Sequence, residues 1–292
     1  YITVNTSMDI LTNQQHWFSE RHADSATAFS LEITQCLHEE QTDYQKIAIF
    51  ETKSFGNLMV IDDCIMLTQR DNFIYHEMMT HPALFNHPAP RHVVIVGGGD
   101  CGTLREVAKH KEVEQITQVE IDCRVTELSL EFFPELCTAN QDSRVQFEFT
   151  DAIQWMQQAA DASIDLIIVD STDPIGPAEG LFREAFYRDC ERVLATDGIL
   201  VQQSESPLVH WESITKKMQL AMATAGFAKQ QTLFFPQPVY PTGWWSATLA
   251  ARDELHLVRD RQCKAAEFDT DYYNYGIHLA ATAVPNFILK QS

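Results

Sequence analysis

The chain has 292 residues, enough for one large domain or two smaller ones, and 45% of them are hydrophobic. Its 41 acidic and 21 basic residues give a formal net charge of −20. Because phosphate binding needs basic patches, this charge argues against a nucleic-acid partner and favours a cationic ligand. No apolar run approaches the roughly 20 residues that a membrane-spanning helix needs, so we expect no membrane partner.

The cysteines are scattered along the chain and include no CxxC pair. They are Cys36, Cys64, Cys101, Cys123, Cys137, Cys190 and Cys263. An odd, dispersed set argues against a disulfide framework and a zinc site, and a reducing cytoplasm is the simplest location. Residues 1–18 lack the basic-then-apolar pattern of a secretion signal. Residue 1 is not a methionine, which leaves the natural start of the chain open.

The first part of the chain predicts a small antiparallel β domain. Short segments rich in β-branched and aliphatic residues follow one another, and a Ser-Phe-Gly-Asn turn separates two of them. These segments are residues 28–35, 44–52, 57–62 and 64–69. The segment 72–85 is then predicted to be helical as far as Pro82. The proline-rich segment 86–92 marks a boundary.

After this boundary, predicted strands and helices alternate. The strands are 92–97, 115–122, 145–151, 165–170 and 198–205, with helices at 104–110, 124–133, 153–160 and 182–194. A helix over 211–225 and strands near Thr232 and Ala247 follow. This rhythm predicts an α/β fold, a Rossmann-like, class I methyltransferase-like sheet of seven strands. The predicted regions are an N-terminal extension (1–27), a small β-strand domain (28–75) and a Rossmann-like catalytic domain (76–292).

Acidic residues stand at the ends of successive predicted strands, which is where such sheets bind their ligands. Gly97 and Gly99 lie in a glycine-rich turn after the first strand, where a ligand can approach the main chain. Glu120 ends the second strand and suits the two ribose hydroxyls, while Asp151 ends the third and suits an adenine edge. We therefore expect a ligand that contains adenosine.

Asp100 follows these glycines, where S-adenosylmethionine would be expected to place its carboxylate. An aspartate there repels a carboxylate and attracts an ammonium group. The turn therefore suits decarboxylated S-adenosylmethionine, whose aminopropyl arm ends in a bare amine. The alternative is that Asp100 only caps the following helix, a common role for aspartate.

Two further carboxylates, Asp170 and Asp173, stand at the end of the fourth strand and on the proline-stiffened loop after it. Such a pair suits a diamine that arrives doubly protonated. One nitrogen must lose its proton to become a nucleophile, which costs roughly 4–5 kcal/mol at pH 7 for an amine with a pKa of ~10.4, like that of lysine. Asp170 can accept that proton. Asp173 can also be explained as a turn residue.

Taken together, these residues resemble the polyamine aminopropyltransferase family, in particular its spermidine synthases. The motifs that carry the resemblance are GGGDCGTLREV, VEID, DSTDPIGPAEGLF with AFY, RDNFIYHEMMTHPAL and YYNYGIHLAATAVPNF, and it covers roughly residues 28 to 290. It implies a small β domain on a Rossmann-like domain, usually in a homodimer. It also implies transfer of the aminopropyl group of decarboxylated S-adenosylmethionine to putrescine, giving spermidine and 5′-methylthioadenosine without a cofactor or a metal.

The resemblance further implies roles for single residues. Gln45 and Glu120 would hold the ribose and thioether region, Asp151 and Ala152 the adenine, and Asp100 the aminopropyl amine. Asp170 would be the proton acceptor, with Tyr75, His76, Asp173 and Tyr240 lining the amine site. Pro177 would lie in a mobile loop over the nucleoside, and Gln203 is a weaker candidate.

Alternatives stay open at this point. The acceptor could be another amine, such as cadaverine, agmatine or spermidine, because the choice depends on pocket length. A diamine N-methyltransferase is argued against by Asp100, and a catalytically silent polyamine-binding regulator by the presence of both Asp170 and Asp173. A metal site is not expected in HEMMTH, because His76 and His81 are five residues apart and do not share a helix face as zinc-protease ligands do.

Overall fold

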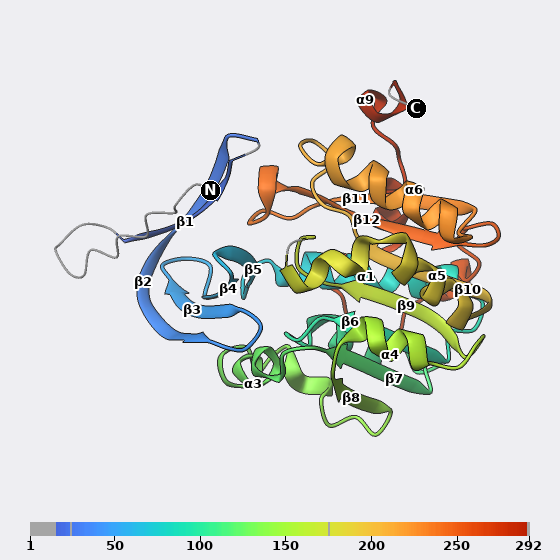
Figure 1. The fold of residues 1–292 in the computed structure, drawn as a ribbon, viewed down its shortest axis with the longest axis horizontal. Helices are drawn as coiled ribbons and strands as arrows, with labels where there is room; N and C mark the ends of the chain where they lie inside the picture. Colours follow the sequence, from blue (N-terminus) through green and yellow to red (C-terminus); the bar gives the residue numbers. More distant parts are fainter. Residues whose placement is uncertain (1–15, 24, 175, 291–292) are drawn as a thin grey trace.

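The computed structural model describes residues 16–23, 25–174 and 176–290, which form two sheets and the helices around them (Figure 1). The first sheet is antiparallel, with its strands side by side in chain order. They are β1 (Trp17–His22), β2 (Thr27–Gln41), β3 (Lys46–Thr52), β4 (Asn57–Ile61) and β5 (Cys64–Thr68). Asp62 and Asp63 have positive φ angles of 49° and 66° and join β4 to β5 in a tight hairpin turn.

The segment predicted as an N-terminal extension contributes a strand to this sheet. β1 pairs with β2 along its whole length, with Trp17 opposite Glu32 and His22 opposite Thr27. The β1 sequence, WFSERH, contains no β-branched residue, which is why the pattern did not indicate a strand here. In Figure 1, β1 and β2 lie at the far left, away from the second sheet.

Helix α1 (Asn72–Asn86) runs through Pro82, so the prediction that it ends at this proline is wrong. Proline removes one backbone hydrogen bond and crowds the preceding turn, which destabilises an isolated helix. Nearly every side chain of α1 is buried, with Met78, Met79 and Leu84 fully enclosed. Packing of this kind outweighs local propensity, because most helical stability in proteins comes from tertiary contacts.

The second sheet has seven strands in the order β11-β12-β10-β9-β6-β7-β8, which confirms the predicted α/β, Rossmann-like fold. The strands are β6 (His92–Gly97), β7 (Gln115–Glu120), β8 (Val145–Phe149), β9 (Ile164–Asp170), β10 (Leu194–Gln203), β11 (Lys229–Pro236) and β12 (Trp244–Ala251). Neighbouring strands from β10 to β8 run parallel, and β12 is antiparallel to both β10 and β11. The carboxyl ends of β6, β7, β8 and β9 therefore meet along one edge.

Helices cover both faces of this sheet. One layer consists of α4 (Ala152–Gln158), α5 (Glu184–Val193) and α6 (Lys216–Ala225), which face the viewer in Figure 1. The opposite layer contains α1, α2 (Gly102–Ala108), α7 (Asp260–Lys264) and α8 (Tyr275–Ala281), and α9 (Asn286–Leu289) lies near the end of the chain. Each layer buries its apolar side chains against the sheet. This packing holds the strand ends, and the acidic residues on them, in a constant position.

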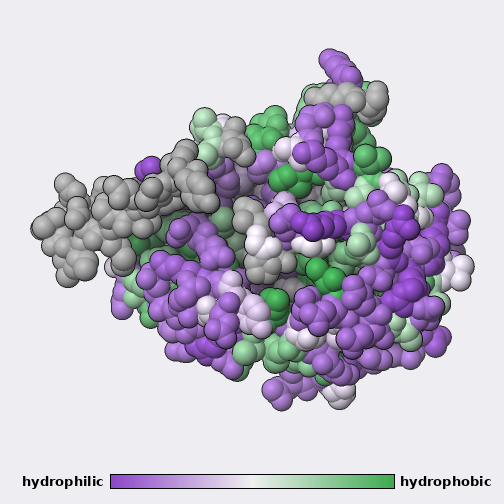
Figure 2. Space-filling view, in the orientation of Figure 1, coloured by the Kyte–Doolittle hydropathy of each residue, from purple (hydrophilic) through white to green (hydrophobic). Residues whose placement is uncertain are grey.

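The two sheets are joined through helix α3 (Cys123–Phe132). Val125 and Leu128 of α3 pack with Ile47, Ile49 and Met59 of the first sheet in one apolar cluster. The face shown in Figure 2 is mostly hydrophilic, with smaller apolar patches. Among the described residues, no helix is both long enough and apolar enough to cross a membrane.

Candidate active site

Two connected cavities lie where the first sheet meets the carboxyl edge of the second. The large chamber, about 220 Å³, is lined by the glycine turn together with Gln45, Glu120, Asp151 and Ala152. The small chamber, about 40 Å³, is lined by Glu20, Gln203, Pro241 and Trp245. The walls of both chambers include Cys64, Met66, Tyr75, Thr172, Asp173 and Tyr240. Two ligands, one in each chamber, can therefore meet at these shared walls, which form the chamber junction.

The glycine turn fits against the ends of two strands only because it carries no side chains. A Cβ on Gly97, whose φ is +78°, would lie 2.3 Å from the carbonyl oxygen of Asp170. Gly98 donates its N–H to that same oxygen at 2.7 Å. A Cβ on Gly99 would lie 2.8 Å from Oε2 of Glu120. The main chain of the turn is thus exposed to a ligand between β6 and β7.

The residues predicted to hold the nucleoside line the large chamber, and several also have structural contacts. Glu120 accepts a hydrogen bond from the N–H of Asp122 at 2.9 Å, and burial raises its pKa to about 7. Asp151 caps α4 by accepting from the N–H of Ile153 at 2.8 Å. The amide of Gln45 donates to Oδ2 of Asp122 at 3.1 Å. The nucleoside-binding roles of these residues stay predictions.

Pro177 belongs to the 3-10 segment η2 (Gly176–Phe182). The predicted position of its side chain over the nucleoside lies outside the described part of the structure.

Asp100 is held by two contacts to the same carboxylate oxygen. Its Oδ1 accepts from the N–H of Gly102 at 2.6 Å and lies 3.1 Å from Nε2 of His76. Burial acts to raise the pKa of Asp100, but the charge and hydrogen bond of His76 outweigh it and bring the pKa below its usual value. Asp100 therefore caps the turn and also presents a negative charge to the large chamber.

His76 lies behind Asp100 and is absent from the walls of both chambers. Its ring is buried and fills the space above Gly102, where a Cβ would come within 2.1 Å of Cε1. The predicted contact of His76 with the amine stays a prediction. The structure makes it the partner of Asp100, because its contact with that carboxylate opposes burial and raises its own pKa.

Asp170 stands at the end of β9 with a hydroxyl donor on each carboxylate oxygen. Tyr75 donates to Oδ1 at 2.7 Å, and Thr103 donates to Oδ2 at 2.6 Å. Burial and the neighbouring charge of Asp100 raise the pKa of Asp170. Each oxygen keeps a second lone pair, so this oriented carboxylate can still accept a proton from a ligand at the chamber junction.

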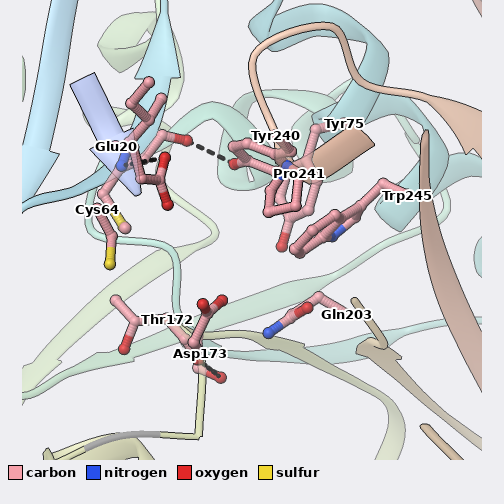
Figure 3. Close-up of a pocket in the computed structure, with 12 residues that line it drawn as sticks. Glu20, Cys64, Tyr75, Thr172, Asp173, Gln203, Tyr240, Pro241 and Trp245 are labelled. Atoms are coloured by element: carbon pink, nitrogen blue, oxygen red, sulfur yellow. Dashed lines mark hydrogen bonds between the residues drawn. The ribbon is translucent and has the colours of Figure 1, made fainter. Parts of the chain in front are cut away.

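Two acidic side chains, Glu20 and Asp173, line the small chamber (Figure 3). Glu20 from β1 accepts from the N–H of Ile65 at 3.1 Å, and burial raises its pKa to about 7. Asp173 shares a hydrogen bond with the buried Glu205, and burial raises the pKa of both carboxyls, that of Glu205 to about 7. The rings of Tyr240 and Trp245 form one side of this space in Figure 3. The chamber combines apolar walls with acids that a cation would ionise.

Sequence patterns missed three of the residues that complete this site. Glu20 lies in the segment predicted as an extension, and its place depends on pairing between β1 and β2. Thr103 is the second residue of α2, and only the fold brings it to Asp170. Glu205 follows β10 with a positive φ of 67°. Its position two residues after Gln203, at a strand end, could have indicated a site residue from the sequence.

Comparison with known proteins identifies the family. Residues 72–260 match the family described as spermine/spermidine synthase domain. The chain belongs to this family. A polyamine aminopropyltransferase of Methylococcus capsulatus is 58% identical over 277 residues, which cover 95% of this chain and 97% of that protein. The polyamine aminopropyltransferase of Thioalkalivibrio sulfidiphilus is 56% identical over 276 residues, or 94% and 97% of the two chains. The resemblance predicted from the motifs is confirmed.

Solved spermidine synthases have the same fold as this member of the family. One, crystallised in complex with the transition state analogue AdoDATO, superposes with a TM-score of 0.90 at 30% identity and covers 98% of both chains. The spermidine synthase of Thermotoga maritima gives a TM-score of 0.86 at 28% identity, over 95% of this chain and 96% of that one. Residues 16–69 match the family described as spermidine synthase tetramerisation domain.

Proposed function

We propose that the protein transfers the aminopropyl group of decarboxylated S-adenosylmethionine to putrescine, giving spermidine and 5′-methylthioadenosine. The observation that carries this proposal is the position of Asp170. Its carboxylate lies in the large chamber beside Asp100, and its hydrogen-bond donor Tyr75 lines both chambers. A proton acceptor thus stands where an amine in the small chamber would meet a nucleoside in the large one.

The large chamber has the charges that this donor needs. The decarboxylated donor carries a sulfonium and a terminal ammonium, and both are cations. Asp100 and Asp170 provide negative charge at the β6 and β9 ends, close enough for each to affect the other's protonation. Glu120 and Asp151 supply acceptors for a ribose and an adenine at the β7 and β8 ends. The donor would therefore lie across the strand ends with its propyl carbon towards the small chamber.

The reaction is a direct displacement. The neutral amine attacks the propyl carbon next to the sulfonium, the carbon–nitrogen bond forms as the carbon–sulfur bond breaks, and methylthioadenosine leaves as a neutral thioether. Asp170 accepts the proton that the attacking nitrogen loses. Holding both reactants at one junction also removes much of the entropic cost of a bimolecular reaction.

The small chamber favours a short diamine as the acceptor. It is small, at about 40 Å³, and its wall includes the acids Glu20 and Asp173. A carboxylate that faces the far nitrogen keeps this nitrogen charged and orients the near nitrogen for attack. The rings of Tyr240 and Trp245 cover the methylene chain between them. These features support putrescine ahead of cadaverine, agmatine or spermidine.

An amine panel tests the proposal. We expect methylthioadenosine to be released from decarboxylated S-adenosylmethionine fastest with putrescine, more slowly with cadaverine, and at trace rates with spermidine and agmatine. Release is measured by chromatography, with S-adenosylmethionine as the alternative donor in parallel. A diamine N-methyltransferase would instead give S-adenosylhomocysteine from that donor. Binding of both ligands without any product would favour a silent regulator.

The acids of the small chamber predict that putrescine binds more tightly as pH rises through neutrality. Glu20 on the chamber wall and Glu205, the hydrogen-bond partner of the wall residue Asp173, have pKa values raised to about 7. Below this pH they hold protons, are neutral and attract a cation weakly. Ionisation of each carboxyl should improve affinity by about tenfold between pH 6 and pH 8. Calorimetry in two buffers of different ionisation enthalpy would show proton release on binding. An affinity that is flat over this range would contradict the assignment of these acids to the amine.

We also propose that the N-terminal sheet joins copies of the chain, since residues 16–69 match a tetramerisation domain and Trp17 on the edge strand β1 is 53% exposed. The resemblance in the motifs implied a homodimer, and light scattering in solution distinguishes a dimer from a tetramer.

All seven cysteines are free thiols, which supports a reducing location such as the cytoplasm.

A further inference from the structure

Two thiols lie directly behind the glycine turn of the large chamber. Cys101 follows Asp100 and is fully buried, and Cys137 begins the 3-10 segment η1 (Cys137–Ala139) with 6% exposure. The Cys137 thiol donates to the carbonyl oxygen of Asp100 at 4.0 Å, in the peptide group that precedes Cys101. The two thiols are close enough for each to change the pKa of the other.

Cys101 also has an unusual backbone conformation for a residue with a side chain. Its φ of 68° and ψ of 5° place it in the left-handed region, where glycine is favoured. The Cys101 thiol donates to the carbonyl oxygen of Gly99 at 3.5 Å, so its sulfur lies within the turn itself. A change at this sulfur therefore acts directly on Gly99 and Asp100.

We propose that Cys101 and Cys137 form a reversible disulfide when the protein meets a peroxide, and that this bond weakens nucleoside binding. Of the other free cysteines, Cys36 donates to the carbonyl oxygen of His38, and Cys263 contacts the hydroxyl of Tyr273. Among them, Cys190 is as deeply buried as Cys101 and serves as an internal comparison.

The chemistry balances with hydrogen peroxide as the oxidant. The Cys137 thiolate attacks one peroxide oxygen, the O–O bond breaks, and Cys137 becomes a sulfenic acid as hydroxide leaves. The Cys101 sulfur then attacks the Cys137 sulfur, the S–O bond breaks, and the departing oxygen leaves as water with the Cys101 proton. Two thiols are oxidised to one disulfide and one peroxide is reduced to two waters.

The environment makes Cys137 the attacking thiol. The hydrogen bond from Cys101 lowers the pKa of Cys137 by stabilising its thiolate, whereas burial raises the pKa of Cys190 well above its usual value. The neighbouring Thr138 is exposed, so η1 lies at the surface, where a small oxidant can reach it. Thiolate character and access together select the site of oxidation.

The new bond would move the turn. A disulfide brings the sulfurs to about 2.05 Å, closer than two hydrogen-bonded thiols, so Cys101 must shift towards η1. Asp100 would move with it, away from the 2.6 Å contact with Gly102 and the 3.1 Å contact with His76. A ligand that loses a hydrogen bond to a charged group such as Asp100 binds roughly ten- to hundredfold more weakly.

Peroxide titration followed by peptide mass spectrometry tests the bond itself. We expect a cross-linked peptide pair containing Cys101 and Cys137, with the loss of two hydrogen atoms and full reversal by dithiothreitol. Cys190 should stay reduced under the same conditions. Sulfinic acid at Cys137 without any cross-link, or no reaction at either thiol, would overturn the proposal.

Two variants connect the bond to binding. Cys101→Gly suits the left-handed conformation and should fold normally, and Cys137→Ala removes the other thiol. Affinity for decarboxylated S-adenosylmethionine, whose terminal amine would face Asp100, is measured by calorimetry before and after peroxide. The native chain should lose at least about tenfold in affinity and recover it with dithiothreitol, while both variants stay unchanged. An equal loss in the variants would overturn the proposed link to this pair. Mass spectrometry does not depend on the proposed function, so failure of decarboxylated S-adenosylmethionine to bind at all is a separate result.

Discussion

Asp170→Asn is expected to lower the rate of methylthioadenosine release by ~10²–10⁴-fold, the usual effect of removing a general base. The amide keeps the size of the carboxyl and can still accept from Tyr75 or Thr103. In the native chain these hydroxyls donate to the Asp170 carboxylate at 2.7 and 2.6 Å. What it loses is the ability to take a proton from the amine. Because the proposed nucleoside site lies mainly at other strand ends, binding of methylthioadenosine should change little.

Thr103→Val is the matched control for this variant. It removes one hydrogen bond to the same carboxylate and leaves the proton acceptor in place. Such a loss typically lowers the folding stability by about 1–3 kcal/mol in a buried site. The proton acceptor itself remains, so the rate should fall less than in Asp170→Asn. Single-turnover rates and calorimetry with methylthioadenosine on both variants separate chemistry from binding. An Asn variant that keeps more than a third of the native rate would exclude Asp170 as the acceptor.

The second sheet was predictable because its signals are local. Apolar runs at 92–97 and 165–170 are bounded by glycines, aspartates and helical segments, and each became a buried parallel strand. The same local pattern places an acid at each strand end, and Asp100, Glu120 and Asp151 line one chamber. Because the strands are parallel, residues at the ends of successive strands become neighbours along one edge of the sheet.

The parts that could not be predicted depend on contacts between distant segments. Glu20 reaches the small chamber only because β1 pairs with β2 and its N-terminal sheet lies against the carboxyl edge. Pro82 stays within α1 because tertiary packing outweighs the lost hydrogen bond. His76 faces Asp100 from behind, and no spacing along the helix shows which face meets the glycine turn. Burial and pairing partners of this kind are properties of the whole fold.

Asp100→Asn is expected to reduce the preference for decarboxylated S-adenosylmethionine over S-adenosylmethionine by tenfold or more. Two unit charges ~4 Å apart interact by about 4 kcal/mol at an effective dielectric of ~20. In the proposed binding mode the carboxylate of Asp100 would attract the terminal ammonium of the first ligand and repel the carboxylate that the second ligand adds. Asparagine keeps an acceptor for the N–H of Gly102, now at 2.6 Å, so the turn keeps its cap and only the charge is lost.

Asp151→Asn is the matched control for the charge at Asp100. Asp151 also lines the large chamber and also caps a helix, accepting from Ile153 at 2.8 Å. In the proposed binding mode it lies at the adenine end, which both ligands share. Its loss should weaken both ligands alike and leave their ratio unchanged. Calorimetric titration of both ligands into the native chain and the two variants gives these ratios directly. If Asp100→Asn leaves the ratio at its native value, Asp100 acts only as a cap, and selection of the decarboxylated donor must come from steric exclusion of the carboxylate.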